Sequence, residues 1–553
     1  MHRRTFLSAL SLLAAGVVAL PSQAQRPAER PGPDPVALIR AEGLQRSQVM
    51  ETLEYLTDAI GPRLTGSPGM KRANEWTRDR LSSWGLQNAK LEPWGPFGRG
   101  WSLERFSMQV TEPQAIPLIA YPKAWSPGTN GTLKADVVYL EAKTEADLEQ
   151  YRGKLKGKIV LVTPPREVAA HFEPEAARYS DSALLDLANA AVGQSRLLPP
   201  ATPPAENPTS APPPVPRPAE RQERPNPRFT AARLRFLVQE GVGLIVDAGS
   251  RGDGGTLFVQ GASVPVPADA PEGTRISAWS KEAKTAPQVT VAVEHYHRLL
   301  RMLKHGQTPR LQVELKVRFH DDDPMQYNTV GEIPGSDLAG EVVMLGAHLD
   351  SWHGGTGATD NGAGVAVCME AVRILQSLGL RPRRTIRVAL WSGEEQGLHG
   401  SRAYVAEHFG GGRGPAGPGG AAPELPRKPE HDRLSAYYNL DNGTGRIRGI
   451  YLQGNEALRP IFREWLAPFR DLGASTLSAA NTGSTDHIPF DSVGLPGFQF
   501  IQDPLEYRSR THHSNMDVLE RIQADDLKQA SVIMAAFVYQ TAMREGLLPR
   551  KPR

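Results

Sequence analysis

Short apolar segments that alternate with helical segments after residue 326 restrict the fold of this chain more than any other feature. Four of these segments are rich in branched or aromatic residues, as buried strands are. They are "EVVMLGA" (341–347), "TIRVALW" (385–391), "SAYYNL" (435–440) and "PGFQFI" (496–501). Between the first two, apolar side chains of residues 361–379 recur at helical spacing, and the segment ends at Gly379. The alternation predicts an α/β fold with an open, mostly parallel (mixed) sheet flanked by helices.

The rest of the chain predicts a second domain. With 553 residues, the chain is too long for one ordinary hydrophobic core. The pattern of residues 36–90 is mostly helical, whereas short β-rich runs are spread over residues 115–325. We therefore predict a discontinuous α/β domain, residues 36–114 and 326–545, with a β-rich domain inserted between its two parts.

Three segments have compositions that cannot build a core. Residues 25–35 form a linker, residues 199–227 a proline-rich loop of the inserted domain, and residues 410–430 a Gly/Pro-rich surface loop.

The N-terminus has the pattern of a secretory signal peptide. A basic start is followed by an apolar run from Phe6 to Leu20 and by the small residues "SQA", which predicts a signal over residues 1–24. Arg3 and Arg4 resemble a twin-arginine signal, which exports proteins that are already folded. No later segment is long and apolar enough to cross a bilayer. The sequence thus predicts an exported protein, periplasmic or extracellular, with no stable membrane anchor.

The charge balance argues against a nucleic-acid-binding protein, and the cysteine count excludes internal disulfide bonds. Lys plus Arg total 63 against 60 for Asp plus Glu, so the chain offers no broad basic surface for nucleic acid. Its single cysteine, Cys368, cannot form an internal disulfide.

Metal-binding residue types follow the predicted strands. In open α/β sheets, ligands bind at the carboxyl ends of the strands. The residues found there are His348, Glu394, Glu395, Asp441, His512, His513 and Asp517, and Asp360 stands at the start of the helix from 361.

Each of these residues, taken alone, has an ordinary structural explanation. Asp360 suits a helix N-cap, Asp441 an Asx turn, and His348 a hydrogen-bonded core histidine. Together, two histidines, two aspartates and a glutamate form a ligand set suited to zinc, and also to cobalt or manganese. Five side chains exceed the needs of one tetrahedral zinc and suit two ions that share a carboxylate. A cation would also explain why Glu394 and Glu395 stand side by side despite their like charges.

Five ordered motifs carry a resemblance to a known family. "HLDS", "TDNGAG", "SGEEQG", "LDNG" and "HHSNMD", with "IGPRLTGSPG" near the start, resemble the secreted co-catalytic di-zinc exopeptidases, which include bacterial aminopeptidases and carboxypeptidase Q. The inserted region, residues 115–325, resembles a protease-associated domain. The resemblance implies a secreted, zinc-dependent exopeptidase that hydrolyses short peptides or dipeptides with two Zn²⁺ ions per chain.

The resemblance also implies roles for individual residues. His348 and Asp441 would hold one zinc, Glu395 and His513 the other, and Asp360 would bridge the two. Glu394 would be the general base that takes a proton from an activated water.

Four further residues have two interpretations each. Asp350 would hold a ligand imidazole or lie in a surface turn, and Asp517 would hold an imidazole or cap the following helix. Several members of the family place a tyrosine near the zinc as an oxyanion donor, and in glutamate carboxypeptidase II this tyrosine stands at the position of His512. Whether His512 takes that role is open. His487 would line the pocket or lie in a structural loop.

Two other functions remain as alternatives. Glutaminyl cyclase shares this fold but uses a single zinc and performs no hydrolysis, and a binding protein on a peptidase scaffold would perform no chemistry. The sequence leaves open the preferred side chain, the peptide end that is recognised, and the oligomeric state, with a homodimer as one alternative.

Overall fold

A computed structural model describes Met1 and residues 34–194, 226–271, 273–411 and 426–551. Apart from Met1, the predicted signal peptide lies outside these residues, as do most of the linker 25–35, the proline-rich loop 199–227 and the loop 410–430. Residues 35–553 form one compact unit. None of the helices in the described residues is long and apolar enough to span a bilayer.

The first sheet has eight strands and contains all four strands predicted after residue 326. Its order is β1 (Gln87–Trp94), β10 (Gln326–Ile333), β12 (Arg384–Trp391), β11 (Leu338–His348), β13 (Leu434–Asn439), β16 (Gly497–Gln502), β14 (Ile447–Tyr451) and β15 (Thr476–Ser478). β11 lies at the centre and pairs in parallel with β12 and β13, and β13 pairs in parallel with β16. β1, β10 and β14 add antiparallel pairs, so the sheet is mixed, as predicted.

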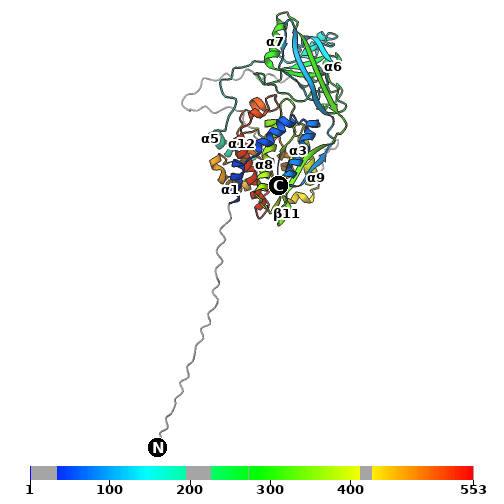
Figure 1. The fold of residues 1–553 in the computed structure, drawn as a ribbon. Helices are drawn as coiled ribbons and strands as arrows, with labels where there is room; N and C mark the ends of the chain where they lie inside the picture. Colours follow the sequence, from blue (N-terminus) through cyan, green and yellow to red (C-terminus); the bar gives the residue numbers. More distant parts are fainter. Residues whose placement is uncertain (2–33, 195–225, 272, 412–425, 552–553) are drawn as a thin grey trace. The chain divides into compact units, whose positions relative to one another are not determined.

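Helices cover both faces of this sheet (Figure 1). On one face lie α1 (Pro35–Gln45), α2 (Val49–Glu54), α8 (Ala363–Ser377) and α12 (Ala524–Met543), which share one large core with the central strands. On the other face, α9 (His399–His408) and α11 (His487–Ser492) pack on Trp391 and Tyr437. Burial on both sides explains why the central strands are mostly apolar.

The predicted helical region near the N-terminus contains three α-helices and one π-helical turn before β1. After α1 and α2, a π-helical turn spans Tyr55–Ile60, and α3 spans Pro68–Ser83. The Ser67 hydroxyl accepts a hydrogen bond from the Met70 amide, which caps the first turn of α3. Gly85, at φ +88°, follows its last turn, where a residue without a side chain is favoured.

The second sheet also has eight strands. Its order is β3 (Ile116–Pro117), β2 (Gly100–Glu112), β9 (Arg310–His320), β5 (Thr132–Tyr139), β6 (Ile159–Leu161), β7 (Leu244–Asp247), β8 (Gln288–Val291) and β4 (Ala120–Pro122). The other α-helices among the described residues are α4 (Glu145–Leu148), α6 (Pro227–Gln239), α7 (Val293–Lys304) and, beside the first sheet, α5 (Asp181–Ala188) and α10 (Arg459–Leu466). Figure 1 shows α6 and α7 beside the second sheet.

One strand of the second sheet begins before the boundary predicted at residue 115. β2 pairs with β9 along almost its whole length, from Gly100 to Glu112, so it extends this sheet although it precedes the predicted insertion. The division of the chain into a peptidase domain and an inserted protease-associated domain stays a prediction.

Candidate metal centre

The predicted ligands come from loops at one edge of the first sheet. His348 is the last residue of β11, Glu395 follows β12, and Asp441 follows β13. Asp360 lies in a π-helical turn, Ala358–Gly362, that leads into α8. His513 follows a second π-helical turn, Tyr507–Thr511, beyond the end of β16. The parallel order of the central strands therefore brings these side chains to one place.

Asp360 lies between the two histidines. Its Oδ1 is 3.3 Å from His348 Nε2, and its Oδ2 is 3.2 Å from His513 Nε2. Asp441 Oδ1 is 3.5 Å from His348 Nε2, and Glu395 Oε2 is 2.9 Å from His513 Nε2. The five predicted ligands thus form two groups of donors with Asp360 common to both, as a carboxylate that bridges two ions requires.

Two buried carboxylate oxygens of the site lack well-placed hydrogen-bond donors in the described part of the chain, and a metal ion would satisfy them. Asp360 is 3% exposed, and within the described residues its Oδ2 and the buried Oε1 of Glu395 accept no hydrogen bond of good geometry. Buried carboxylate oxygens without a donor are costly, and a cation would satisfy them. Imidazole nitrogens with carboxylate oxygens form the N/O set that zinc binds.

The pKa values of the site reflect crowded, buried charges. Burial and the neighbouring charge of Asp360 raise the pKa of Glu395 to about 7, against the opposing effect of His513. Burial alone would lower the pKa of His513, but the charges of Glu395 and Asp360 outweigh it and raise that pKa to about 10. Burial raises the pKa of Glu394 well above its ordinary value, and Asp441 and Glu395 contribute to this rise. Positive charge at this place would relieve the repulsion among the carboxylates.

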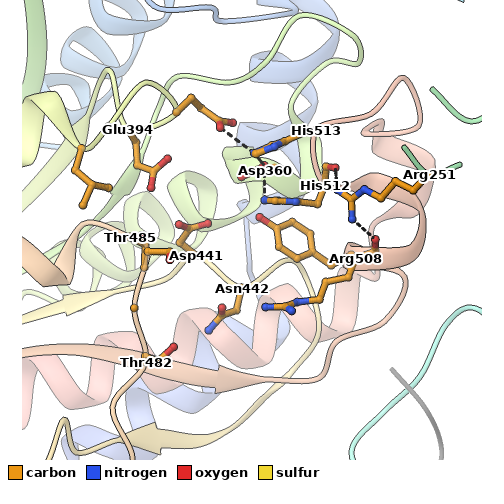
Figure 2. A pocket seen from close by; sticks show the side chains of 16 residues that line it. Arg251, Asp360, Glu394, Asp441, Asn442, Thr482, Thr485, Arg508, His512 and His513 are labelled. Atoms are coloured by element: carbon orange, nitrogen blue, oxygen red, sulfur yellow. Dashed lines mark hydrogen bonds and ion pairs between the residues drawn. The ribbon is translucent and has the colours of Figure 1, made fainter. Parts of the chain in front are cut away.

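Glu394 faces a pocket of about 540 Å³ beside the ligands. Figure 2 shows its carboxylate directed into this pocket, opposite Asp441, while His512 and His513 lie on the far side. Glu394 is therefore placed to reach a molecule that sits between the ligand groups and the pocket.

Two predicted carboxylates, Asp350 and Asp517, hold main chain, and Asp350 Oδ1 also lies 3.7 Å from His348 Nδ1. The carboxylate of Asp350 accepts hydrogen bonds from the backbone N–H groups of Glu394 and Glu395, each at 3.2 Å, and the His348 ring contacts its backbone carbonyl at 2.9 Å. The carboxylate of Asp517 accepts hydrogen bonds from the backbone N–H groups of Thr359 and Asp360, and it does not cap a helix. Both aspartates thus fix the backbone of ligand-bearing loops.

His512 and His487 have different positions relative to the pocket. His512 stacks on His513 with ring centroids 3.7 Å apart and lines the pocket, with its Nε2 3.7 Å from Asp360 Oδ2. His487 is buried, contacts the carbonyl of Thr482 at 3.1 Å and does not line this pocket. Burial lowers the pKa of each to about 4.

Three ionisable residues of the pocket were not predicted from the sequence. Tyr507 is buried beside Asp360, and burial, with the charge of Asp360, raises its pKa well above its ordinary value. Arg251 and Arg508 also line the pocket. No motif marks these residues, although Arg508 and Tyr507 stand only a few positions before the "HHS" sequence.

Known proteins are similar to this chain in sequence. Residues 328–538 match the profile of peptidase family M28. Carboxypeptidase Q of Bos taurus is 27% identical over 92% of this chain and 88% of its own length, and aminopeptidase YwaD of Bacillus subtilis (strain 168) is 28% identical over 44% of this chain and 50% of its own length.

Solved structures share the fold. A peptidase M28 precursor from Shewanella amazonensis superimposes with a TM-score of 0.61 at 22% identity, covering 94% of this chain and 98% of its own. The zinc aminopeptidase BSAP from Bacillus subtilis gives 0.52 at 18% identity, covering 91% and 96%.

The profile match covers every strand end that contributes to the donor groups, and the similarity to carboxypeptidase Q extends over most of both chains. These findings confirm the resemblance on which the site was predicted: residues 328–538 are similar to peptidase family M28, and most of the chain is similar to carboxypeptidase Q.

Proposed function

We propose that this protein is a zinc-dependent exopeptidase that hydrolyses short peptides. One observation carries the proposal: Asp360 lies within 3.3 Å of two histidines, each of which also faces a second carboxylate. His348 and Asp441 would hold one zinc, Glu395 and His513 the other, and Asp360 would contact both. The related carboxypeptidase Q and aminopeptidases support cleavage at a peptide end.

Bound zinc would supply an activated water near neutral pH and polarise the scissile carbonyl. The carboxylate of Glu394 would take a proton from the attacking water and give it to the leaving amine. Asp350 holds the backbone of Glu394 and Glu395 together, so the base and its neighbouring ligand keep a fixed separation. Asp517 does the same for the backbone at Asp360.

The pocket supports a small substrate. Its volume of about 540 Å³ lies within the range of about 300–1,000 Å³ that is usual for sites of small ligands. Export to the periplasm or the exterior is part of the proposal and rests on the sequence of residues 1–24.

A panel of dipeptides with free, N-blocked or amidated ends tests this function. We expect hydrolysis to free amino acids, loss of activity with a chelator, and recovery when zinc is restored. Formation of pyroglutamate from N-terminal glutamine would instead support a cyclase. Absence of turnover in zinc-replete protein would support a binding protein.

The cationic part of the pocket favours substrates with a free carboxylate. Arg251 and Arg508 line the pocket together, and Figure 2 shows the guanidinium of Arg508 directed toward Asn442. Arg251 donates hydrogen bonds to the carbonyls of Arg508 and His512 and stacks on Phe258, which fixes it at the rim. We expect a C-terminal carboxylate to pair with Arg508, because its guanidinium lines the pocket beside Asn442.

Replacing Arg508 by Met is expected to lower kcat/KM for a free dipeptide by about tenfold, because a charge-assisted hydrogen bond of about 1.5 kcal/mol is lost. Hydrolysis of the corresponding dipeptide amide should be almost unchanged. Arg510→Met is the matched control, because Arg510 belongs to the same turn but pairs with Glu175. Equal losses on both substrates in the Arg508 variant would show that Arg508 does not recognise the carboxylate.

A further inference from the structure

A segment that follows β7 of the second sheet lies against the loop that carries His513. The backbone N–H of Val259 donates to the carbonyl of His513 at 3.0 Å. The backbone N–H of Asn515 donates to the carbonyl of Leu257 at 3.0 Å, and the Asn515 side chain accepts from the Leu257 N–H at 2.7 Å. The loop of the last predicted ligand is therefore held by a distant part of the chain.

The side chain of Gln260 extends this contact to the imidazole itself. The amide nitrogen of Gln260 lies 3.0 Å from Nδ1 of His513. On the other side of the ring, Nε2 faces Glu395 at 2.9 Å and Asp360 at 3.2 Å. One nitrogen of His513 thus points to the donor group and the other to Gln260.

His513 needs such support because its backbone is strained. Its φ is +64°, in the left-handed region that residues with a side chain rarely adopt. A residue in this region keeps its conformation only when the surrounding structure fixes it. The Trp352 ring, 5.9 Å from the His513 ring, and the contacts of Val259 and Gln260 surround this residue.

Both predicted histidine ligands direct Nε2 toward Asp360, but their Nδ1 atoms contact different partners. His348 Nδ1 contacts the backbone carbonyl of Asp350 at 2.9 Å, only two residues along the chain. His513 Nδ1 contacts a side chain that lies far away in the sequence. A substitution can therefore remove the second support and leave the first in place.

The chemistry of ligation fixes the direction of the Gln260 hydrogen bond. An imidazole that binds a cation through Nε2 is neutral and carries its proton on Nδ1, which must then donate. A half-turn of the Gln260 amide brings its carbonyl oxygen, an acceptor, into the place of the nitrogen. We infer that Gln260 is a positioning residue that accepts a hydrogen bond from His513 Nδ1 and orients this ligand, so that the part of the chain bearing the second sheet helps to build the metal centre. This inference rests on the proposed zinc function.

Zinc binding to the metal-free protein, measured by competition with a chelator of known affinity, tests the inference. We expect wild-type protein to bind two zinc ions and Gln260→Leu to bind one of them about 10- to 100-fold more weakly, because the imidazole loses its acceptor. The other zinc, held through His348, should keep its affinity. Gln307→Leu, an exposed glutamine after α7, should bind both ions like wild type.

A second variant tests the direction of the hydrogen bond. Gln260→Glu keeps an acceptor but offers no amide donor, so it should bind both zinc ions at least as tightly as wild type. In zinc-bound wild type, NMR should also show a slowly exchanging proton on His513 Nδ1 that Gln260→Leu lacks.

Unchanged affinity of both zinc ions in Gln260→Leu, or equal weakening of both, would overturn the inference and leave the proposed function intact. Weakening in Gln260→Glu equal to that in Gln260→Leu would likewise overturn it. If wild type binds no zinc at micromolar concentration, the proposed function itself fails.

Discussion

Replacing Glu394 by Gln is expected to reduce kcat by about 10²- to 10⁴-fold, the usual contribution of a positioned general base. The amide keeps the shape of the side chain but cannot take a proton. Because the five predicted ligands do not include Glu394, the variant should still bind two zinc ions. Turnover of a dipeptide and the zinc content of the same sample measure both effects.

The neighbouring Glu395→Gln variant is the control for this prediction. Glu395 faces His513 at 2.9 Å, so its loss should lower zinc occupancy as well as activity. If Glu394→Gln instead loses zinc, Glu394 is a ligand. If it keeps both zinc and turnover, the base lies elsewhere.

Replacing Asp360 by Ala should abolish the stabilisation that zinc gives to the folded protein. Asp360 contacts both histidines, so its removal weakens both donor groups at once. A ligand at about a thousandfold its Kd stabilises the folded state by about 4 kcal/mol. Wild type should therefore melt several degrees higher with zinc than with a chelator, whereas Asp360→Ala should melt at the same temperature in both.

Asp337→Ala is a suitable control for this measurement. Asp337 is an exposed carboxylate that pairs with Arg383, so the variant should keep the full response to zinc. A zinc response in Asp360→Ala as large as that of wild type would contradict the bridging position of Asp360.

The centre of the first sheet could be predicted because its strands are buried on both faces. β11, β12, β13 and β16 are mostly apolar, so their composition alone identifies them. β1 has the sequence "QNAKLEPW" at the sheet edge, where mostly exposed residues carry no such signal. The predicted boundary leaves residues 100–112, which form β2, in the segment 36–114. The reason is different from that for β1: the partner strand β9 lies far along the chain, and pairing over that distance leaves no local pattern.

The candidate ligands could be predicted because they follow the central strands directly, where sheet topology brings separate segments together. Asp350 and Asp517 lie near the candidate ligands, and their carboxylates accept hydrogen bonds from backbone N–H groups, which sequence spacing does not reveal. The contact of Gln260 with His513 depends on the packing of two distant segments. Sequence motifs do not identify residues whose role depends on such packing.

Stepwise addition of zinc to metal-free protein, with dipeptide hydrolysis recorded at each step, tests the central claim most directly. The account predicts that full turnover to free amino acids requires two zinc ions per chain. Full activity at one zinc ion per chain, or no hydrolysis with two bound, would contradict it.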